Sequence, residues 1–317
     1  MANLIILCII KSAVGNLKTG LFILFRMNLK YFVSIFALHM KNKKILWVII
    51  ILILITTVGI TYTLYRSGDL NVSLSGTFKK KAPPIILNLS SIEDGYTITP
   101  YDNGSVLKYL GFHLSYNEEF EQSTWTAYIL TGKMVSDGFV ERSNNFRSDT
   151  NIATMSASLA DYRKSGYDRG HLVPAGDMKW SETAMSESFL LSNMSPQVPG
   201  FNRNIWKKLE SKVRYWAIAY DSVYVVTGPV LTNIDQFVGN NQVGVPKYFF
   251  KVIVDISFPT YKGIAFLIEN KASGDDIFHY AITIDSLEKY LDYDFFPRQD
   301  PYSITMIESS LDLAEWK

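Results

Sequence analysis

Residues Ile45–Tyr65 form an uncharged, strongly apolar run that can be buried only in a bilayer or in a protein core. Its length matches the about 20 residues that a helix needs to cross the hydrocarbon layer. Lys41, Lys43 and Lys44 precede the run, so the positive-inside rule keeps this flank in the cytoplasm and predicts export of everything that follows. A buried core helix and a cleaved signal sequence are the alternatives, and no small-residue cleavage motif follows the run.

The charge of the chain changes after this apolar run. Residues 1–66 contain eight lysines and arginines and no acidic residue, whereas residues 67–317 contain 23 basic and 30 acidic residues. We therefore expect a basic and apolar N-terminal segment (1–44), a single transmembrane anchor (45–65), a linker (66–95) and an extracytoplasmic folded domain (96–317). Met40 stands directly before the lysines and is the expected start of translation.

The composition limits what the C-terminal part of the chain can be. With 48% hydrophobic and 19% charged residues, the bulk of the chain should fold. The single cysteine, Cys8, excludes an internal disulfide and a cysteine-based metal site. The net negative charge of residues 67–317 argues against binding a polyanion through overall charge, but it permits a local basic cleft.

Residues 96–317 have the mixed pattern of an α+β domain. Runs rich in β-branched and aromatic residues predict strands at 125–130, 223–226, 249–256 and 263–268. The spacing of four between Ile205, Leu209 and Val213 predicts a helix over 201–215. A shorter helix is expected at 285–291, and no solenoid repeat is visible.

The segment Asp168–His171 places an acid, a guanidinium group, a glycine and an imidazole in four consecutive residues. Imidazole suits a general base near neutral pH because its unperturbed pKa is about 6.5. The guanidinium group of Arg169 suits bidentate binding of a phosphate. A surface turn with an incidental ion pair is the alternative, and the chemistry of these four residues alone does not decide between the two.

A second group of polar residues follows around Asn202. If Asn202 opens a helix, Glu210 lies two turns further on and about 80° around the axis, on one broad face. An amide oxygen there could bind a hard cation such as Mg²⁺, and the carboxylate could bind the water that Mg²⁺ retains. Asparagine is also a good helix N-cap, and Asn202 taken alone is better explained as one.

Several motifs in a fixed order resemble the DNA/RNA non-specific endonuclease family, which includes endonuclease G. The central motifs are Asp-Arg-Gly-His at 168–171, Ser-Asn-x-x-Pro-Gln at 192–197 and Asn-x-x-x-Trp-x-x-Leu-Glu at 202–210. Further similar segments lie at 114–116 with 125–128, at 227–229, at 245–251 and at 294–297. The resemblance covers about residues 96–315 and implies the ββα-metal fold of that family, with a central antiparallel sheet flanked by helices.

The resemblance also implies roles for single residues. His171 would be the general base, Asn202 the metal ligand, and Arg169 a contact to the phosphate or the transition state. The residues expected to support the metal's waters, the loop or the substrate phosphate are Glu210, Asn193, Gln197 and Arg142, with Arg147 as the rival of Arg142. The loop 172–178 departs from the family around Asp177, where asparagine is common, and no role is expected for it.

These roles predict metal-dependent hydrolysis of phosphodiester bonds in both DNA and RNA with little sequence preference. Mg²⁺ is the expected cofactor, Mn²⁺ is the alternative metal, and the resemblance suggests a homodimer. A catalytically inactive nuclease-like binding module, an adhesion module and a phosphodiesterase for small substrates are the competing hypotheses.

Overall fold

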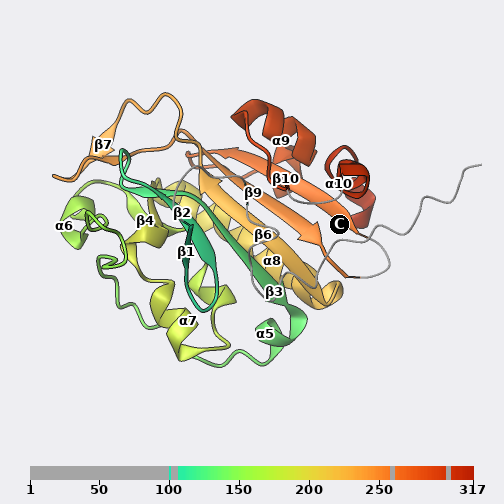
Figure 1. Cartoon of the computed structure of the whole chain (residues 1–317), viewed down its shortest axis with the longest axis horizontal. Helices are drawn as coiled ribbons and strands as arrows, with labels where there is room; N and C mark the ends of the chain where they lie inside the picture. The colour runs from blue at the N-terminus through green and yellow to red at the C-terminus, as the bar shows by residue number, and fades with distance from the viewer. Residues whose placement is uncertain (1–99, 101–105, 258–260, 298–300) are drawn as a thin grey trace, which may run out of the picture. The chain divides into compact units, whose positions relative to one another are not determined.

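A seven-stranded antiparallel sheet forms the centre of the computed structural model (Figure 1). The structure describes residues 100, 106–257, 261–297 and 301–317. The sheet contains, in spatial order, β1 (Val106–Lys108), β2 (His113–Asn117), β3 (Gln122–Thr131), β6 (Ser222–Pro229), β9 (Tyr248–Asp255), β10 (Lys262–Glu269) and β11 (Ala281–Ile282). The four strands predicted from the sequence correspond to β3, β6, β9 and β10, so the expected central antiparallel sheet is confirmed.

Strands β6 and β9 lie near the middle of the sheet, and both are buried along almost their whole length. Their sequences are nearly continuous runs of apolar residues, as expected when both faces of a strand are covered. Because side chains alternate along a strand, Val225 and Ile253 pack on one face while Val226 and Val252 pack on the other. The sheet therefore separates two cores.

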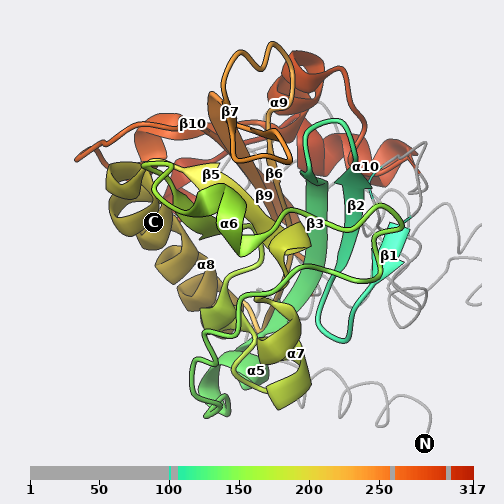
Figure 2. The same cartoon turned by 90° about the vertical axis from the view of Figure 1, so that its left-hand side faces the viewer.

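Helices cover both faces of the sheet, with α8 on one side and α9 and α10 on the other (Figure 2). The α-helices are α5 (Gly132–Ser136), α6 (Leu159–Tyr162), α7 (Glu182–Glu187), α8 (Lys207–Ala219), α9 (Ile284–Leu291) and α10 (Pro301–Glu308). Short 3₁₀ turns occur at η2 (Ala175–Asp177), η3 (Leu191–Asn193), η5 (Ile277–Tyr280) and η6 (Leu313–Glu315). Helix α9 begins after Thr283, whose side chain accepts a hydrogen bond from the Ser286 main chain.

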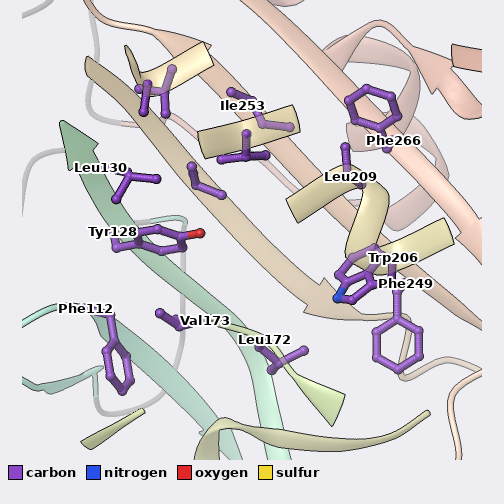
Figure 3. Packing of buried hydrophobic residues seen from close by; sticks show 14 of the residues in the cluster. Phe112, Tyr128, Leu130, Leu172, Val173, Trp206, Leu209, Phe249, Ile253 and Phe266 are labelled. Atoms are coloured by element: carbon purple, nitrogen blue, oxygen red, sulfur yellow. The ribbon is translucent and has the colours of Figure 1, made fainter. Parts of the chain in front are cut away.

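The core beneath α8 joins this helix to the sheet (Figure 3). Trp206 and Leu209 from the helical segment pack with Phe249 and Ile253 of β9, and all four side chains are almost fully buried. Full burial of one such side chain contributes about 1.5–3 kcal/mol. This packing fixes the position of the N-terminal end of α8.

A strand pair and a helix form a separate unit beside the large sheet. Strand β4 (Asp168–His171) pairs antiparallel with β5 (Met194–Gln197), and the π-helical turn η4 (Phe201–Trp206) then leads directly into α8. A second small pair, β7 (Phe237–Val238) with β8 (Val243–Gly244), lies elsewhere in the domain. The β4–β5–α8 unit carries most of the polar residues that the sequence motifs contain.

The expected anchor Ile45–Tyr65 and the expected linker 66–95 lie outside the described residues. In the part of the chain that the structure describes, none of the helices has the length and apolarity required to span a bilayer.

Candidate active site

The β4–β5 pair places the Asp-Arg-Gly-His segment against the Pro-Gln end of the second motif. Asp168 lies opposite Gln197, and His171 lies opposite Met194. A Cβ atom added to Gly170 would stand only 2.1 Å from the side chain of Gln197. The glycine is therefore required because the glutamine side chain packs directly on its backbone.

The imidazole of His171 is buried between two aromatic rings. Phe189 and Phe146 contact it edge-on, with ring centroids 4.9 Å and 5.7 Å away. Burial, together with the positive charges of Arg142 and Arg169, lowers the pKa of His171 to about 3. The ring is therefore neutral at pH 7. It makes a hydrogen bond with the backbone of Arg169, and its Nε2 atom has no hydrogen-bond partner among the described residues.

Two arginines lie on the outer side of the same aromatic pair. The guanidinium carbon of Arg142 is 4.7 Å from the centre of the Phe189 ring, and that of Arg169 is 4.1 Å from the centre of the Phe146 ring. None of the ion pairs found within the described residues includes either arginine. Both guanidinium groups are thus held near His171 with their charge available to an anion.

The structure also distinguishes Arg142 from Arg147, the alternative arginine for the same role. The guanidinium group of Arg147 donates to the main-chain oxygens of Asn145 and Ser186. The positive charge of Arg142 instead lowers the pKa of His171 and attracts the carboxylate of Glu210. Of the two arginines, the geometry brings Arg142 to the histidine.

Asn202 is the second residue of the π-helical turn η4, and the alternative reading of this residue as an N-cap is wrong. The cap position is Gly200, and the main-chain N–H of Asn202 already donates to Val198. The side-chain Nδ2 donates to the carboxylate of Asp168 at 2.9 Å. A carboxylate can only accept here, so the amide is oriented with its oxygen facing away from Asp168 and free to act as a ligand.

Asp168 orients this amide, a role that the sequence did not reveal. Its carboxylate accepts hydrogen bonds from Asn202 and from Arg203, whose Nη2 is 2.6 Å away. Burial alone would raise the pKa of Asp168, but the hydrogen bonds from Arg203 and Asn202 outweigh burial and hold this pKa below its usual value. The acid therefore remains a charged acceptor, and it acts through Asn202.

Glu210 lies on α8, two turns after Asn202. Burial raises the pKa of its carboxyl group to about 7, against the opposing effect of the Lys251 charge. Asp177 raises this pKa further, whereas Arg214 and Arg142 lower it. The carboxylate is thus placed among cations on several elements, and Glu210 belongs to the same electrostatic cluster as Arg142 and His171.

Asn193 and Gln197 are both completely buried, but they differ in their hydrogen bonds. The amide of Asn193 binds the N–H and C=O of Val173 and the C=O of Ser188. It therefore holds the loop that follows His171, and a contact between Asn193 and the substrate stays a prediction. Both amide atoms of Gln197 are without a hydrogen-bond partner in the described part of the chain.

The loop 172–178, for which no role was expected, contributes a buried ion pair beneath the site. Asp177 binds Arg214 of α8 at 2.7 Å and accepts a hydrogen bond from Tyr128 of β3 at 2.6 Å. Breaking such a buried pair usually costs about 3–5 kcal/mol. The pair connects the loop, the sheet and the helix that carries Glu210, and only the long-range pairing in the fold reveals it.

The neutral buried imidazole, the two guanidinium groups without carboxylate partners and the oriented amide oxygen together have the chemistry that suits binding and hydrolysis of a phosphate ester. A family model described as DNA/RNA non-specific endonuclease matches residues 95–301 of this chain. The chain therefore belongs to the DNA/RNA non-specific endonuclease family, and the predicted resemblance is confirmed.

Individual relatives and a solved structure agree with this assignment. Human mitochondrial endonuclease G is 39% identical over 152 residues, which are 44% of this chain and about half (51%) of the human protein. Nuclease C1 of Cunninghamella echinulata var. echinulata is 34% identical over 203 residues, or 59% of this chain and 81% of the nuclease. A chain of the crystal structure of the EndoG/EndoGI complex superposes with a TM-score of 0.60 at 31% identity, covering 67% of this chain and 92% of that one.

Proposed function

We propose that the chain hydrolyses phosphodiester bonds of DNA and RNA with little sequence preference, using His171 as general base and a divalent cation held by Asn202. The observation that carries the proposal is the buried, neutral imidazole of His171, whose Nε2 atom lacks a partner while Arg142 and Arg169 lie beside it. Membership of a nuclease family supports the reaction class.

His171 can accept a proton because its ring is neutral and its Nε2 atom is free. Arg142 and Arg169 lower the pKa of the imidazole in the absence of substrate. A bound phosphate brings negative charge to the same two arginines, so substrate binding raises this pKa toward the range of a useful base. Proton uptake is thereby coupled to the presence of the phosphate.

In the proposed reaction, His171 takes a proton from a water molecule, and the hydroxide attacks the phosphorus in line. The bond from phosphorus to the 3′ oxygen breaks, this oxygen takes up a proton from solvent water, and the products carry a 3′ hydroxyl and a 5′ phosphate. Arg142 and Arg169 bind non-bridging oxygens and offset their growing charge. The 2′ hydroxyl takes no part, so DNA and RNA are both substrates.

The residues present fit a hard divalent cation. The free amide oxygen of Asn202 is a suitable ligand, and the carboxylate of Glu210 and the unpartnered amide of Gln197 are suitable acceptors or donors for water bound to the ion. When bound, the cation would supply charge stabilisation to the phosphate and the leaving oxygen. One protein ligand with retained water suits Mg²⁺, with Mn²⁺ as the alternative.

Low sequence preference follows from which groups meet the substrate. Arginines and a cation contact phosphate, and phosphate contacts position a nucleic acid without reading its bases. The net negative charge of residues 67–317 adds no attraction for a polyanion, so binding depends on the local arginines.

The chemistry of the products tests this proposal. The full-length protein should convert both double-stranded DNA and single-stranded RNA to fragments with 5′ phosphate ends, detected by ligation or by phosphatase-dependent labelling. It should act only weakly on a small diester such as bis(4-nitrophenyl) phosphate. Cleavage of the small diester alone would support the small-substrate phosphodiesterase, and no cleavage of any substrate would support the inactive binding module.

We also propose that Ile45–Tyr65 anchors the protein in a membrane with the nuclease domain on the extracytoplasmic side. The support is the length of this uncharged run and the lysines at 41, 43 and 44 that precede it. Alkaline carbonate should fail to extract the protein, and protease added outside the cell should degrade the nuclease domain. Extraction, or full protection from protease, contradicts the proposal.

A homodimer remains a prediction from the family resemblance. Analytical ultracentrifugation of the purified protein should give twice the mass of 36.0 kDa that the sequence specifies, and a monomer at all concentrations contradicts it.

A further inference from the structure

Lys251 is a charged side chain in the interior of the domain. It lies on β9, its side chain is completely buried, and lysine is almost never fully buried without a partner. Side chains alternate along a strand, so Lys251 shares the α8 face of the sheet with Phe249 and Ile253. Burying a lysine in this apolar surface costs free energy unless its charge is hydrogen-bonded or paired.

The contacts of Lys251 leave its charge without a direct ion pair. Its Nζ atom donates a hydrogen bond to the hydroxyl of Thr227, which is the register partner on β6. The same Nζ atom lies 4.8 Å from the centre of the Trp206 ring. No carboxylate of the described residues stands within ion-pair distance of it.

Trp206 connects this lysine to the proposed metal site. Asn202, Trp206 and Glu210 follow one another at intervals of four, so they occupy neighbouring turns of one helical segment. The ammonium group that packs on Trp206 therefore lies beneath the segment that carries both Asn202 and Glu210. Glu210 is also the largest electrostatic influence that favours the charged form of Lys251.

We propose that Lys251 is a positioning residue that acts through Glu210: its buried ammonium group, held on Thr227 and Trp206 beneath the helical segment that carries Asn202 and Glu210, supplies the positive charge that the Glu210 carboxylate faces. This inference rests on the proposed function and deepens the role of Glu210 in it. Thr227 and Trp206 hold the ammonium group in place without neutralising it, so its positive charge remains available to a nearby carboxylate.

The other charged groups that face Glu210 do not replace Lys251. Arg214 on α8 is already paired with Asp177, and Asp177 itself repels Glu210. Arg142 is exposed in the loop before β4 and is proposed to bind substrate phosphate. Tyr128 of β3 also faces Glu210, and it stays neutral because burial raises its pKa. Of the cations around Glu210, Lys251 alone is fully buried and free of a paired carboxylate.

A double-mutant cycle on the full-length protein tests the inference. Lys251→Met keeps a long unbranched side chain and removes the charge. It should lower kcat/KM on plasmid DNA about 10- to 100-fold in the presence of Glu210, the usual effect of losing a supporting residue. In the Glu210→Gln background the same substitution should have little further effect. An equal loss in both backgrounds overturns the inference.

Unfolding without metal gives a second readout that is independent of activity. With chelator present, Lys251→Met is introduced once with Glu and once with Gln at position 210, and the urea concentration at the midpoint of unfolding is measured. The substitution should lower this midpoint more, or raise it less, when residue 210 is Glu. Identical shifts in the two backgrounds mean that the ammonium and carboxylate groups do not interact, and they contradict the inference.

The pH profile separates positioning from a structural role. Without the ammonium group the Glu210 carboxyl group binds a proton more readily. The pH at which kcat/KM falls on the acid side of its profile (the acid limb) should therefore rise by about one unit. Thr227→Val is the matched control, because it removes the hydrogen bond but keeps the charge, and its acid limb should stay in place. An unmoved limb in Lys251→Met overturns the inference.

A second substitution at the same position controls for misfolding of Lys251→Met. Lys251→Gln is also neutral but retains a donor for Thr227, and it should show the same dependence on Glu210 and the same shift of the acid limb. If wild type cleaves nucleic acid and Glu210→Gln is fully active, the nuclease function stands and the inference about Lys251 falls. If wild type itself is inactive, the proposed function fails, and the unfolding cycle still decides whether the two charges interact.

Discussion

The two faces of the central sheet differ in chemistry although the same strands build both. The face under α9 and α10 is filled by apolar side chains, such as Val226, Val252 and Ile307. On the opposite face, under α8, the apolar packing is interrupted by Thr227 and Lys251. The interruption lies beneath the helical segment that carries Asn202 and Glu210.

The domain thus assigns packing and site preparation to different faces of the same sheet. None of the proposed active-site residues lies on the α9–α10 face, and the sheet residues there are packed as an apolar core, although α10 also carries the buried carboxyl group of Glu308. The α8 face accepts buried charges and unpartnered polar atoms, each of which costs about 1–3 kcal/mol or more, because they prepare a site for a phosphate and a cation. Substitutions on the two faces should therefore separate cleanly into effects on rate and effects on folding.

The largest effect should come from His171→Ala. Loss of a general base costs about 10²–10⁴-fold in rate, so plasmid cleavage should fall by that factor while far-UV circular dichroism stays unchanged. His279→Ala is the matched control, because His279 is exposed on η5 and should be dispensable. Equal activities of the two variants contradict the assignment of the base.

Asn202→Ala should have the next largest effect. Removal of the amide oxygen should raise the Mg²⁺ concentration needed for half-maximal rate about 10- to 100-fold, as expected for a damaged metal site. Asn204→Ala in the same turn serves for comparison, because Asn204 is exposed and its amide only binds the main chain of Gly200. If both variants require the same Mg²⁺ concentration as wild type, Asn202 is not the ligand.

The pH dependence of stability should expose the buried imidazole. In the unfolded chain the pKa of His171 is about 6.5, whereas in the folded protein it is lowered to about 3. Its contribution to stability is present above pH 6.5 and is lost as the pH falls toward 3, because the unfolded chain then binds the extra proton. Below pH 6.5, wild type should lose stability more steeply than His171→Ala, by up to about 1.4 kcal/mol per pH unit. Urea unfolding with chelator gives the unfolding free energy at each pH. If these values change with pH equally in wild type and in His171→Ala, the imidazole of His171 is not held neutral in the folded protein.

The smallest effect is expected on the apolar face. Ile307→Val removes one methylene group from the α10 packing and should cost about 0.5–1.5 kcal/mol of unfolding free energy. Cleavage by the folded protein should match wild type, since α10 lies on the face opposite α8. A clear loss of kcat without unfolding would break the proposed division between the faces.

Local sequence patterns predicted the four long strands of the sheet, β3, β6, β9 and β10, and the helices α8 and α9. The strands at 125–130 and 249–256 were visible because apolar β-branched and aromatic residues form uninterrupted runs there. The boundary of the helix was less accurate, because its first turn is the π-helical η4, which no periodicity of 3.6 residues reveals.

The site could be predicted only as far as its residues lie in short motifs. His171, Arg169 and Asn202 were proposed in this way, and the structure places them in the β4–β5–α8 unit. The link from Asp168 to Asn202 depends on residues 34 positions apart, and the role of Lys251 depends on how β9 packs beneath α8. In the sequence, Lys251 is hidden within a run that predicts an ordinary buried strand.

The most direct test of the central claim is to remove metal from the full-length wild-type protein and follow supercoiled plasmid while Mg²⁺ is added back. We expect no cleavage with chelator, full cleavage to short fragments with Mg²⁺, and the same fragment distribution from plasmids of unrelated sequence. Cleavage that continues with chelator, or an inactive protein that stays folded with both Mg²⁺ and Mn²⁺, would contradict the central claim.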